Sequence, residues 1–248
     1  MAEFRSRLVI MIPTYNEREN IGGLILDILA LPAEYDLAVL VVDDDSPDGT
    51  AGVVAEISRS DPRIHILVRR GARGRGLAGI EGFRRSLDLG ADFIIEMDGD
   101  GSHLPAYIPC LLEGAHRADL VLGSRFVAGG RDADRSPGRR LITFLVRRFI
   151  RRYFRIPVND VSSGFRCFRR AVLERIGLDG LVSTGPSVVL EVLYKAYRLG
   201  FAIGEVPIVF IDRKKGRTKL TGLTLWKTLL MALRIKKKYK HLEPLVEA

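Results

Sequence analysis

Hydrophobic positions in the first half of the chain form short runs, which are separated by longer stretches of mixed character. Largely apolar runs of three to six residues predict strands over 8–12, 37–42, 64–68, 93–97 and 120–122. The stretches between them predict helices over 17–31, 49–60 and 77–89, with Asn16 and Asp48 as caps of the first two. These strands are apolar on both faces, which is typical of a parallel sheet covered by helices on either side. The pattern therefore predicts an α/β fold with a doubly wound, mostly parallel sheet.

Beyond residue 125 this regular alternation is lost. Residues 126–138 are rich in Gly, Asp, Arg and Pro and predict a mobile loop. Further helices are expected over 139–155, 187–199 and 223–240, and a strand over 202–211 is interrupted by Pro207. Because no segment has the composition of a linker, we do not divide the chain into independent domains, and we distinguish only a main domain and a C-terminal segment. The main domain covers 1–222, including the basic helix at 139–155, and a basic amphipathic helix and tail cover 223–248.

Basic residues are concentrated in two segments of the 248-residue chain, whose formal net charge is +9. Residues 139–155 hold seven Arg and residues 213–240 hold eleven Lys or Arg, and neither segment contains an acidic residue. These 18 positive charges leave the rest of the chain at −9, which indicates a localised anionic partner such as a membrane surface or nucleic acid. The basic segments lack the interleaved aromatic residues of a base-stacking platform, so we expect no nucleic acid.

The apolar stretches are too short to cross a membrane. None approaches the roughly 20 uncharged residues that a spanning helix needs. The N-terminus enters a strand pattern at once and shows no signal-peptide cleavage site. We therefore expect a cytoplasmic protein.

Two aspartates separated by one glycine follow the predicted strand at 93–97. Asp98 and Asp100 thus lie at the strand end, where α/β proteins bind their ligands. Two carboxylates this close repel each other unless a cation neutralises them. Mg2+ or Mn2+ binds one or two such carboxylates together with a diphosphate. The pair therefore predicts a metal site.

The ends of the first two predicted strands also carry polar residues. Asp43, Asp44 and Asp45 follow the strand at 37–42, and one of them could accept hydrogen bonds from a nucleobase or ribose. Pro13 sets a stiff turn after the first strand, and Tyr15 could stack on a base. Three neighbouring strand ends therefore favour a nucleotide-binding enzyme.

A glycine motif offers a different interpretation. Residues 74–79 read G-x-G-x-x-G, follow a predicted strand and open a helix, and Asp98 lies about 20 residues further on. This is the context of a dinucleotide-binding fingerprint. A nicotinamide-dependent oxidoreductase is therefore the alternative from a different class, although it gives Asp100 and the acids at 43–45 no role.

Six motifs occur in a fixed order between residues 8 and 220. They are PTYNE at 13–17, VVDDDSPDGT at 41–50, MDGDGSH at 97–103, GSRFV at 123–127 with Gly129 and Gly130, DVSSGFR at 160–166, and GEVPI at 204–208 with Arg213, Gly216, Lys219 and Leu220. In this order they resemble the family 2 glycosyltransferases, and more closely the polyprenyl (dolichyl) phosphate mannosyltransferases. The resemblance implies a GT-A type nucleotide-sugar domain that transfers mannose from GDP-mannose to a polyprenyl phosphate, with inversion at the anomeric carbon.

The resemblance also implies roles for individual residues. The donor would be held by Pro13, Tyr15, Glu17, Val42, Asp43, Asp44, Asp98, Gly99, Asp100, Arg125, Arg213 and Lys219. Within this set, Asp98 and Asp100 would hold the metal and the diphosphate. A family 2 transferase that uses another nucleotide sugar, such as UDP-glucose, or another acceptor remains an alternative.

A phosphate acceptor changes what the site must supply. It is mostly anionic at neutral pH, its second pKa being about 6, so transfer to it needs no strong general base. Arginine side chains suit its phosphate because guanidinium forms bidentate pairs. The candidate acceptor residues are Arg125, Arg139, Arg140 and Ser163, and the candidate catalytic residues are Asp100, Arg125 and Arg140. Asp160, Ser163 and Arg166 either shape this side of the site or brace a turn.

The acceptor's polyprenyl tail belongs in the bilayer, because each buried CH2 contributes about 0.8 kcal/mol. We therefore expect the basic amphipathic helices at 139–155 and 223–240 to dock peripherally on the cytoplasmic face of an anionic membrane. In the alternative interpretation, their apolar faces pack against the sheet and leave the charges in water. A membrane-anchoring partner subunit is a further candidate partner.

Overall fold

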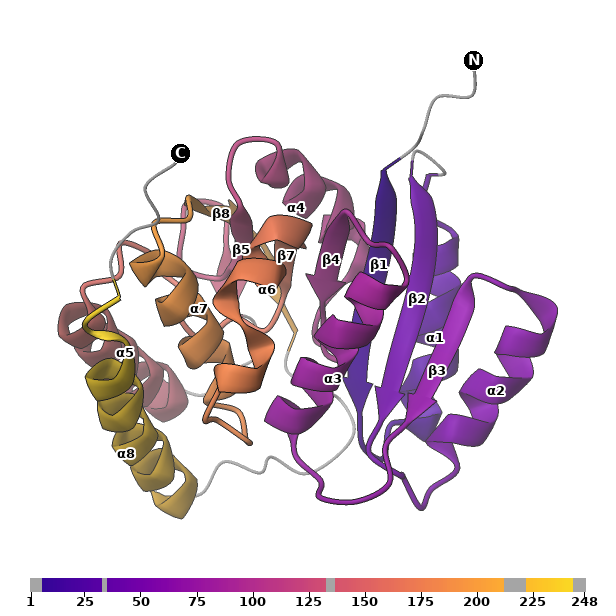
Figure 1. Ribbon diagram of the computed structural model, residues 1–248, viewed down its shortest axis with the longest axis horizontal. Coiled ribbons are helices and arrows are strands. Elements are labelled where there is room, and N and C mark those ends of the chain that lie inside the picture. Colours follow the sequence, from indigo (N-terminus) through magenta and orange to yellow (C-terminus); the bar gives the residue numbers. More distant parts are fainter. Residues whose placement is uncertain (1–5, 33–34, 133–136, 212–221, 243–248) are drawn as a thin grey trace.

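The computed structural model describes residues 6–32, 35–132, 137–211 and 222–242 (Figure 1). A seven-stranded sheet crosses the molecule in the order β3-β2-β1-β4-β7-β5-β8. Its strands are β1 (Arg7–Thr14), β2 (Asp36–Asp43), β3 (Ile64–Val68), β4 (Phe93–Glu96), β5 (Leu120–Ser124), β7 (Arg166–Arg169) and β8 (Ile203–Pro207). Every pairing is parallel except those of β7, which lies antiparallel between β4 and β5. The predicted doubly wound, mostly parallel sheet is thus confirmed.

Helices cover both faces of this sheet. One layer contains α1 (Arg18–Leu29), α2 (Thr50–Ser60) and α4 (Ile108–Ala115), and the other contains α3 (Arg75–Asp88), α5 (Pro137–Phe154), α6 (Arg170–Ile176), α7 (Val188–Arg198) and α8 (Gly222–Tyr239). Short 3-10 turns occupy Pro105–Tyr107 and Leu178–Gly180. The alternation along β1 explains the two layers, because Val9 and Met11 enter one hydrophobic core while Ile10 and Ile12 enter the other. None of the described helices is long and apolar enough to cross a membrane.

The helix starts differ from the predicted caps. The Asn16 prediction is wrong: at φ 61° its backbone N–H donates to Ser46 Oγ, and Glu17 directly precedes α1. Gly49, at φ 88°, occupies the cap position of α2 that was expected for Asp48. Asp48 still accepts the Thr50 N–H at 2.9 Å, from one residue further out. The left-handed backbone at position 49 explains the shift, because glycine adopts it without strain.

The structure contains elements that the apolar pattern did not predict, most of them in the second half of the chain. These are β7, α4, α6 and the short strand β6 (Arg131–Asp132), which lies inside the predicted loop. The predicted strand at 202–211 divides after Pro207 into β8 and β9 (Val209–Phe210), and β9 pairs with β6 in a separate two-stranded sheet. A proline has no N–H to continue a ladder, which accounts for the break.

The two basic helices lie side by side at one end of the molecule, opposite α2 (Figure 1). α8 also packs against α7, and Ala232, Ile235 and Tyr239 are buried in the same core as that helix. From α5, Ile150 and Phe154 join this core. Each helix therefore has one packed face. The domain boundary at 222 stays a prediction.

Candidate active site

The carboxyl ends of β1, β2 and β4 meet at one edge of the sheet. Thr14 ends β1 opposite Asp43 of β2, and its Oγ1 donates to Asp43 Oδ1 at 2.9 Å. Asp43 is fully buried and also accepts the backbone N–H and the hydroxyl of Ser46, at 2.8 and 2.6 Å. This carboxylate therefore closes the turn after β2. Neighbouring Val42 is part of the core.

Asp44, the next residue, is held by the loop between β3 and α3. Its carboxylate pairs with Arg69 and accepts the Gly74 N–H at 2.8 Å. Arg73 donates to the Asp44 carbonyl at 3.1 Å, and its guanidinium carbon lies 5.0 Å from the centroid of the Tyr15 ring. The loop thus brings two arginines to residues that were predicted to hold the nucleoside. The sequence interpretation missed both arginines.

A glycine allows the turn after β4 to approach the end of β1. A Cβ on Gly99 would come within 3.0 Å of Thr14 Cγ2 and 3.7 Å of Glu17 Cγ. Glycine therefore suits this close contact. The structure gathers the predicted donor residues Pro13, Tyr15, Glu17, Val42, Asp43, Asp44, Asp98, Gly99 and Asp100 around one edge of the sheet. Their roles as ligands stay predictions.

Asp98 forms an ion pair that was not predicted. Its Oδ1 accepts from Arg75 Nη2 at 2.6 Å, while Nη1 of the same guanidinium lies 3.2 Å from Glu96 Oε1. Burial alone would lower the pKa of Arg75, but Asp98 and Glu96 raise it, so the guanidinium stays charged. Burial raises the pKa of Glu96, and the charge of Arg75 opposes this change. Arg75 is therefore the local counter-ion of two carboxylates.

His103 and Ser102 order the turn that carries the aspartates. His103 Nδ1 accepts the Asp98 N–H at 3.0 Å, and its ring stacks on Phe165 with centroids 4.9 Å apart. Burial lowers the pKa of His103 although the nearby carboxylates oppose this. Asp100 Oδ1 accepts the N–H and hydroxyl of Ser102, at 3.1 and 2.6 Å. Both aspartates therefore extend from a braced turn.

Arg125, predicted to bind phosphate, is held in a buried ion pair. Its Nε and Nη2 lie 2.7 and 2.8 Å from the two carboxylate oxygens of Asp160. Burial alone would lower the pKa of this guanidinium, but the bonds to Asp160 raise it. The guanidinium carbon lies 5.1 Å from the ring centroids of both Phe126 and Phe210. The pair fixes the direction of Arg125, and contact with the acceptor stays a prediction.

The segment at 160–166 braces a turn, which was one of the two open interpretations. Ser163 is buried, and its hydroxyl bonds the Phe165 backbone. Arg166 is fully buried and donates to the carbonyls of Ser163 and Val189, at 2.6 and 2.5 Å. Burial lowers the pKa of Arg166 to about 10. The predicted contact of Ser163 with the acceptor remains a prediction.

Four predicted residues cannot be placed at this edge. Arg213 and Lys219 lie outside the described residues, and Arg139 and Arg140 are described only by their backbone in the first turn of α5. Their predicted roles stay predictions.

The glycine motif serves packing within the chain. A Cβ on Gly76 would lie 2.7 Å from the Ser183 carbonyl oxygen and 2.7 Å from the Thr184 carbonyl carbon. The Gly76 N–H also donates to the Thr184 carbonyl at 3.1 Å. These glycines therefore allow the loop at 183–185 to approach the start of α3. The concentration of arginines between residues 69 and 75, around this glycine motif, was the sequence signal that could have found Arg69, Arg73 and Arg75.

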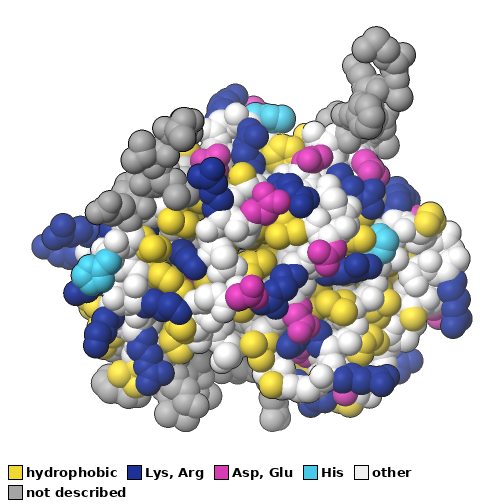
Figure 2. All heavy atoms as spheres, in the orientation of Figure 1, with side chains coloured by type: hydrophobic (Ala, Val, Ile, Leu, Met, Phe, Trp, Pro, Cys, Tyr) yellow, Lys and Arg dark blue, Asp and Glu magenta, His cyan; other side chains and the backbone are white. Residues whose placement is uncertain are grey.

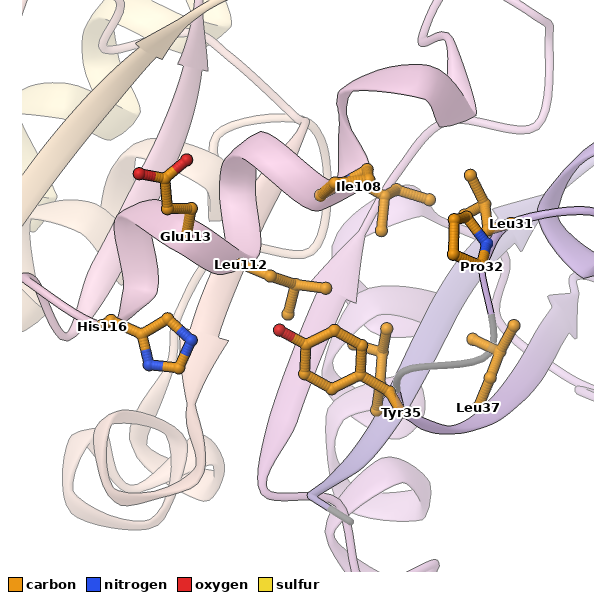
Figure 3. Close-up of a pocket in the computed structure, with 10 residues that line it drawn as sticks. Leu31, Pro32, Tyr35, Leu37, Ile108, Leu112, Glu113 and His116 are labelled. Carbon is orange, nitrogen blue, oxygen red and sulfur yellow. The ribbon is translucent and has the colours of Figure 1, made fainter.

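A cavity at the opposite edge of the sheet lacks the paired carboxylates and arginines found at the strand ends (Figure 3). It has a volume of about 360 Å³, and its walls include Leu8 and Leu37 from the first residues of β1 and β2 and Leu112 from α4. Tyr35 and His116 also line it (Figure 3). The cavity is separated from Asp98 by the length of the strands. The strand ends that carry Asp43, Asp44, Asp98 and Asp100, called the acidic edge below, are therefore the better candidate for the active site.

A doubly wound sheet whose strand ends carry paired carboxylates and arginines is typical of α/β enzymes that bind phosphorylated ligands. The family model described as "Glycosyl transferase family 2" matches residues 9–177. The chain therefore belongs to the family 2 glycosyltransferases and is an enzyme of that class. The nicotinamide-dependent oxidoreductase alternative was wrong.

Two named relatives match most of the chain. The undecaprenyl-phosphate mannosyltransferase of Micrococcus luteus is 39% identical over 216 residues, covering 87% of this chain and 88% of that protein. The polyprenol monophosphomannose synthase of Mycolicibacterium smegmatis is 38% identical over 220 residues, covering 87% and 82%. Among solved structures, glucosyl-3-phosphoglycerate synthase from Mycobacterium tuberculosis, in complex with Mn2+, UDP and glucosyl-3-phosphoglycerate, has a TM-score of 0.68 at 19% identity. That match covers 95% of this chain and 80% of the other, and it shows the shared fold.

Proposed function

We propose that this chain transfers mannose from GDP-mannose to the phosphate of a polyprenyl phosphate, with inversion at the anomeric carbon. The observation that carries the proposal is the acidic edge at Asp98 and Asp100, in a chain 39% identical to an undecaprenyl-phosphate mannosyltransferase. The names of both relatives specify a polyprenyl acceptor and mannose. GDP as the nucleotide rests on the family resemblance that the sequence motifs carry.

The donor set fits Mg2+ or Mn2+, because Asp98 and Asp100 offer carboxylate oxygens on one braced turn. Within the described part of the chain, no group of three or more His, Cys, Asp or Glu side chains could hold a metal ion. Two carboxylates and the donor diphosphate would therefore provide the ligands. When bound, the cation would neutralise charge on the leaving nucleoside diphosphate.

The donor nucleoside would lie beside Tyr15 at the ends of β1 and β2. Arg73, 5.0 Å from the Tyr15 ring, would hold that ring in place for stacking on the base. Asp43 and Asp44 keep the turn after β2 in a fixed shape through their internal hydrogen bonds. Arg213 and Lys219 are assigned to the donor phosphates on the sequence motifs alone.

The acceptor phosphate would approach from the side of Arg125. This side needs cations rather than a base, because the phosphate is already anionic. Asp160 orients Arg125 through two hydrogen bonds, so its guanidinium loses little freedom when it meets a phosphate. Arg139 and Arg140 at the start of α5 would supply further positive charge.

We further propose that the enzyme works peripherally on the cytoplasmic face of an anionic membrane. On α5, Ile142, Leu145 and Phe149 are about half exposed although they are large and apolar. A helix with such a face and many arginines suits the interface of an anionic bilayer. A membrane-anchoring partner subunit would serve the same purpose.

Transfer of label from GDP-[14C]mannose to polyprenyl phosphate, in detergent with Mn2+, tests the function. Asp100→Ala should lose on the order of 10²-fold in turnover, because a metal-held diphosphate loses one of its supports. Asp27→Ala is the matched control, since its exposed carboxylate lies near the end of α1, outside the predicted site. Near-normal turnover of Asp100→Ala in EDTA would overturn the metal assignment. Preference for UDP-glucose would overturn the donor assignment.

A further inference from the structure

α5 from Phe144 onward and the two residues that follow the helix line an open hollow of about 330 Å³. Five of its seven lining residues are arginines and none is acidic. The arginines are Arg147, Arg148, Arg151, Arg152 and Arg155. Phe144 and Ile156 form the apolar remainder of the wall. The hollow is therefore a concentration of positive charge that the proposed reaction does not use.

Two observations indicate that this charge has an anionic ligand. Burial lowers the pKa of Arg147, and the neighbouring Arg151 lowers it further. Arg151 Nε is buried and has no hydrogen-bond partner among the described residues. A buried donor without a partner costs about 1–3 kcal/mol. A phosphate in the hollow would accept from the arginines that line it and reduce the repulsion between the guanidinium groups.

The position of the hollow favours a lipid as the source of that phosphate. Ile142, Phe144, Leu145, Val146 and Phe149, on the same helix, are 37–55% exposed. Phe144 belongs both to this exposed apolar set and to the wall of the hollow. If the apolar side chains enter the bilayer, the arginines lie at the depth of the headgroups. This step rests on the membrane docking included in the proposed function.

The hollow begins next to the candidate active site and extends away from it. The Arg147 guanidinium carbon lies 4.1 Å from the centroid of the Phe126 ring, and that of Arg125 lies 5.1 Å from the same centroid. From Arg147 to Arg152 the helix axis advances a further ~8 Å, and Arg155 follows the end of the helix. A phosphate bound among Arg151, Arg152 and Arg155 is therefore separate from an acceptor phosphate at Arg125.

We propose that this hollow binds the phosphate headgroup of an anionic bilayer lipid, so that α5 recognises the membrane at a discrete site. Guanidinium forks suit this ligand because they bind phosphate oxygens in pairs. The site would hold α5 on the membrane next to Arg125, where the acceptor is used.

Flotation with phosphatidylcholine vesicles containing phosphatidylglycerol tests the proposal. Arg151→Gln/Arg152→Gln should weaken binding about 30-fold, because each of the two basic residues near an anionic surface contributes about 1 kcal/mol. Arg59→Gln/Arg117→Gln removes the same charge outside the hollow and should bind as the wild type does. Arg151→Lys/Arg152→Lys keeps the charge but loses the fork, so it should bind more weakly than the wild type. Equal weakening in the Arg59/Arg117 variant would overturn the proposal, as would full binding by the lysine variant.

Two further measurements distinguish the source of the phosphate and the enzymatic role. Soluble glycerol phosphate that competes with vesicles at low concentration would indicate a site for free phosphate and overturn the lipid assignment. In detergent, mannosyl transfer by Arg151→Gln/Arg152→Gln should equal that of the wild type. A raised KM for polyprenyl phosphate there would make the hollow the acceptor's own site and overturn the proposal. If the wild type transfers no mannose but the hollow variant still loses vesicle binding, the proposed function fails and the lipid site stands.

Discussion

The guanidinium of Arg75 joins two carboxylates that differ in exposure. The side chain of Glu96 is 3% exposed and that of Asp98 is 33% exposed. Arg75 neutralises the buried carboxylate and at the same time orients the one that faces the candidate site. One residue therefore contributes to both stability and chemistry, and substitutions can separate the two contributions.

Arg75→Gln should destabilise the fold by about 3 kcal/mol, because a buried carboxylate loses its ion-pair partner. Burial already raises the pKa of Glu96 above its ordinary value of 4.5, and removal of Arg75 raises it further. A raised carboxyl pKa means that the folded state prefers the protonated form. The folded state of the variant therefore loses stability as the pH rises above the pKa that Glu96 has in the unfolded chain. It regains this stability as the pH falls. Urea unfolding of the variant and the wild type between about pH 5 and pH 8 measures this difference.

The matched control replaces both partners. Arg75→Gln/Glu96→Gln removes the uncompensated charge and should recover most of the lost stability. Mannosyl transfer should be low in both the single and the double variant, because in each of them Asp98 lacks the cation that orients it. If the double variant recovers full transfer, Arg75 has only a structural role.

At the scale of elements, a buried carboxylate links the C-terminal helix α8 to the start of α3. Glu191 on α7 is fully buried, and its Oε1 lies 2.6 Å from the hydroxyl of Tyr239 on α8. The carboxylate also accepts the N–H groups of Val182 and Ser183, at 2.8 and 2.7 Å. This loop continues to Thr184, whose carbonyl accepts the N–H of Gly76 beside Arg75. The position of α8 is therefore connected to the acidic edge through hydrogen bonds.

Tyr239→Phe should lower stability by about 1–2 kcal/mol, because Glu191 loses a buried donor. Amide hydrogen exchange at Val182 and Ser183 should become faster, and mannosyl transfer should fall severalfold through the loosened loop. Tyr197→Phe on α7 is the control, since the Tyr197 hydroxyl makes no hydrogen bond within the described part of the chain. Unchanged exchange at both amides in Tyr239→Phe would show that α8 is not coupled to the loop.

At the scale of the whole molecule, charge is distributed unevenly. Figure 2 shows Lys and Arg side chains over α8 on the left of this face, whereas acidic side chains lie mainly over the middle and right. Each basic helix packs one apolar face and exposes another, and membrane docking stays a prediction. Ile150 and Ala232 pack inward, while Phe149 and Leu233 are 45% and 43% exposed. Docking therefore requires no unfolding of the packed faces.

Binding to anionic vesicles should fall as salt rises, because the screening length shortens from about 10 Å at 0.1 M to about 3 Å at 1 M. Lys237→Glu/Lys240→Glu should weaken it on the order of tenfold or more. These two lysines are exposed, whereas Lys236 contacts the Tyr153 ring on α5 and is left unchanged. Flotation at two salt concentrations measures the effect, and neutral vesicles are the control. Absence of binding even with polyprenyl phosphate present would favour recruitment by a partner subunit.

The sequence alone determined the parallel part of the sheet and the chemistry at its edge. A short continuous apolar run such as 8–12 specifies a strand buried on both faces, because neighbouring residues of a strand enter two different cores. An aspartate directly after a buried strand must lie at the strand end, so Asp43 and Asp98 could be placed without any tertiary information. The order of the six motifs supplied the family.

Only the tertiary structure decided which charges pair and which segments, distant along the chain, join the sheet. Arg75 and Asp98 are 23 residues apart, and Arg125 and Asp160 are 35 apart. β7 enters the sheet between β4 and β5 although it follows both in the chain. The hollow on α5 likewise depends on how the helix packs. Such contacts form when the collapsed chain buries charges that must find partners, and the sequence of a single segment does not contain that information.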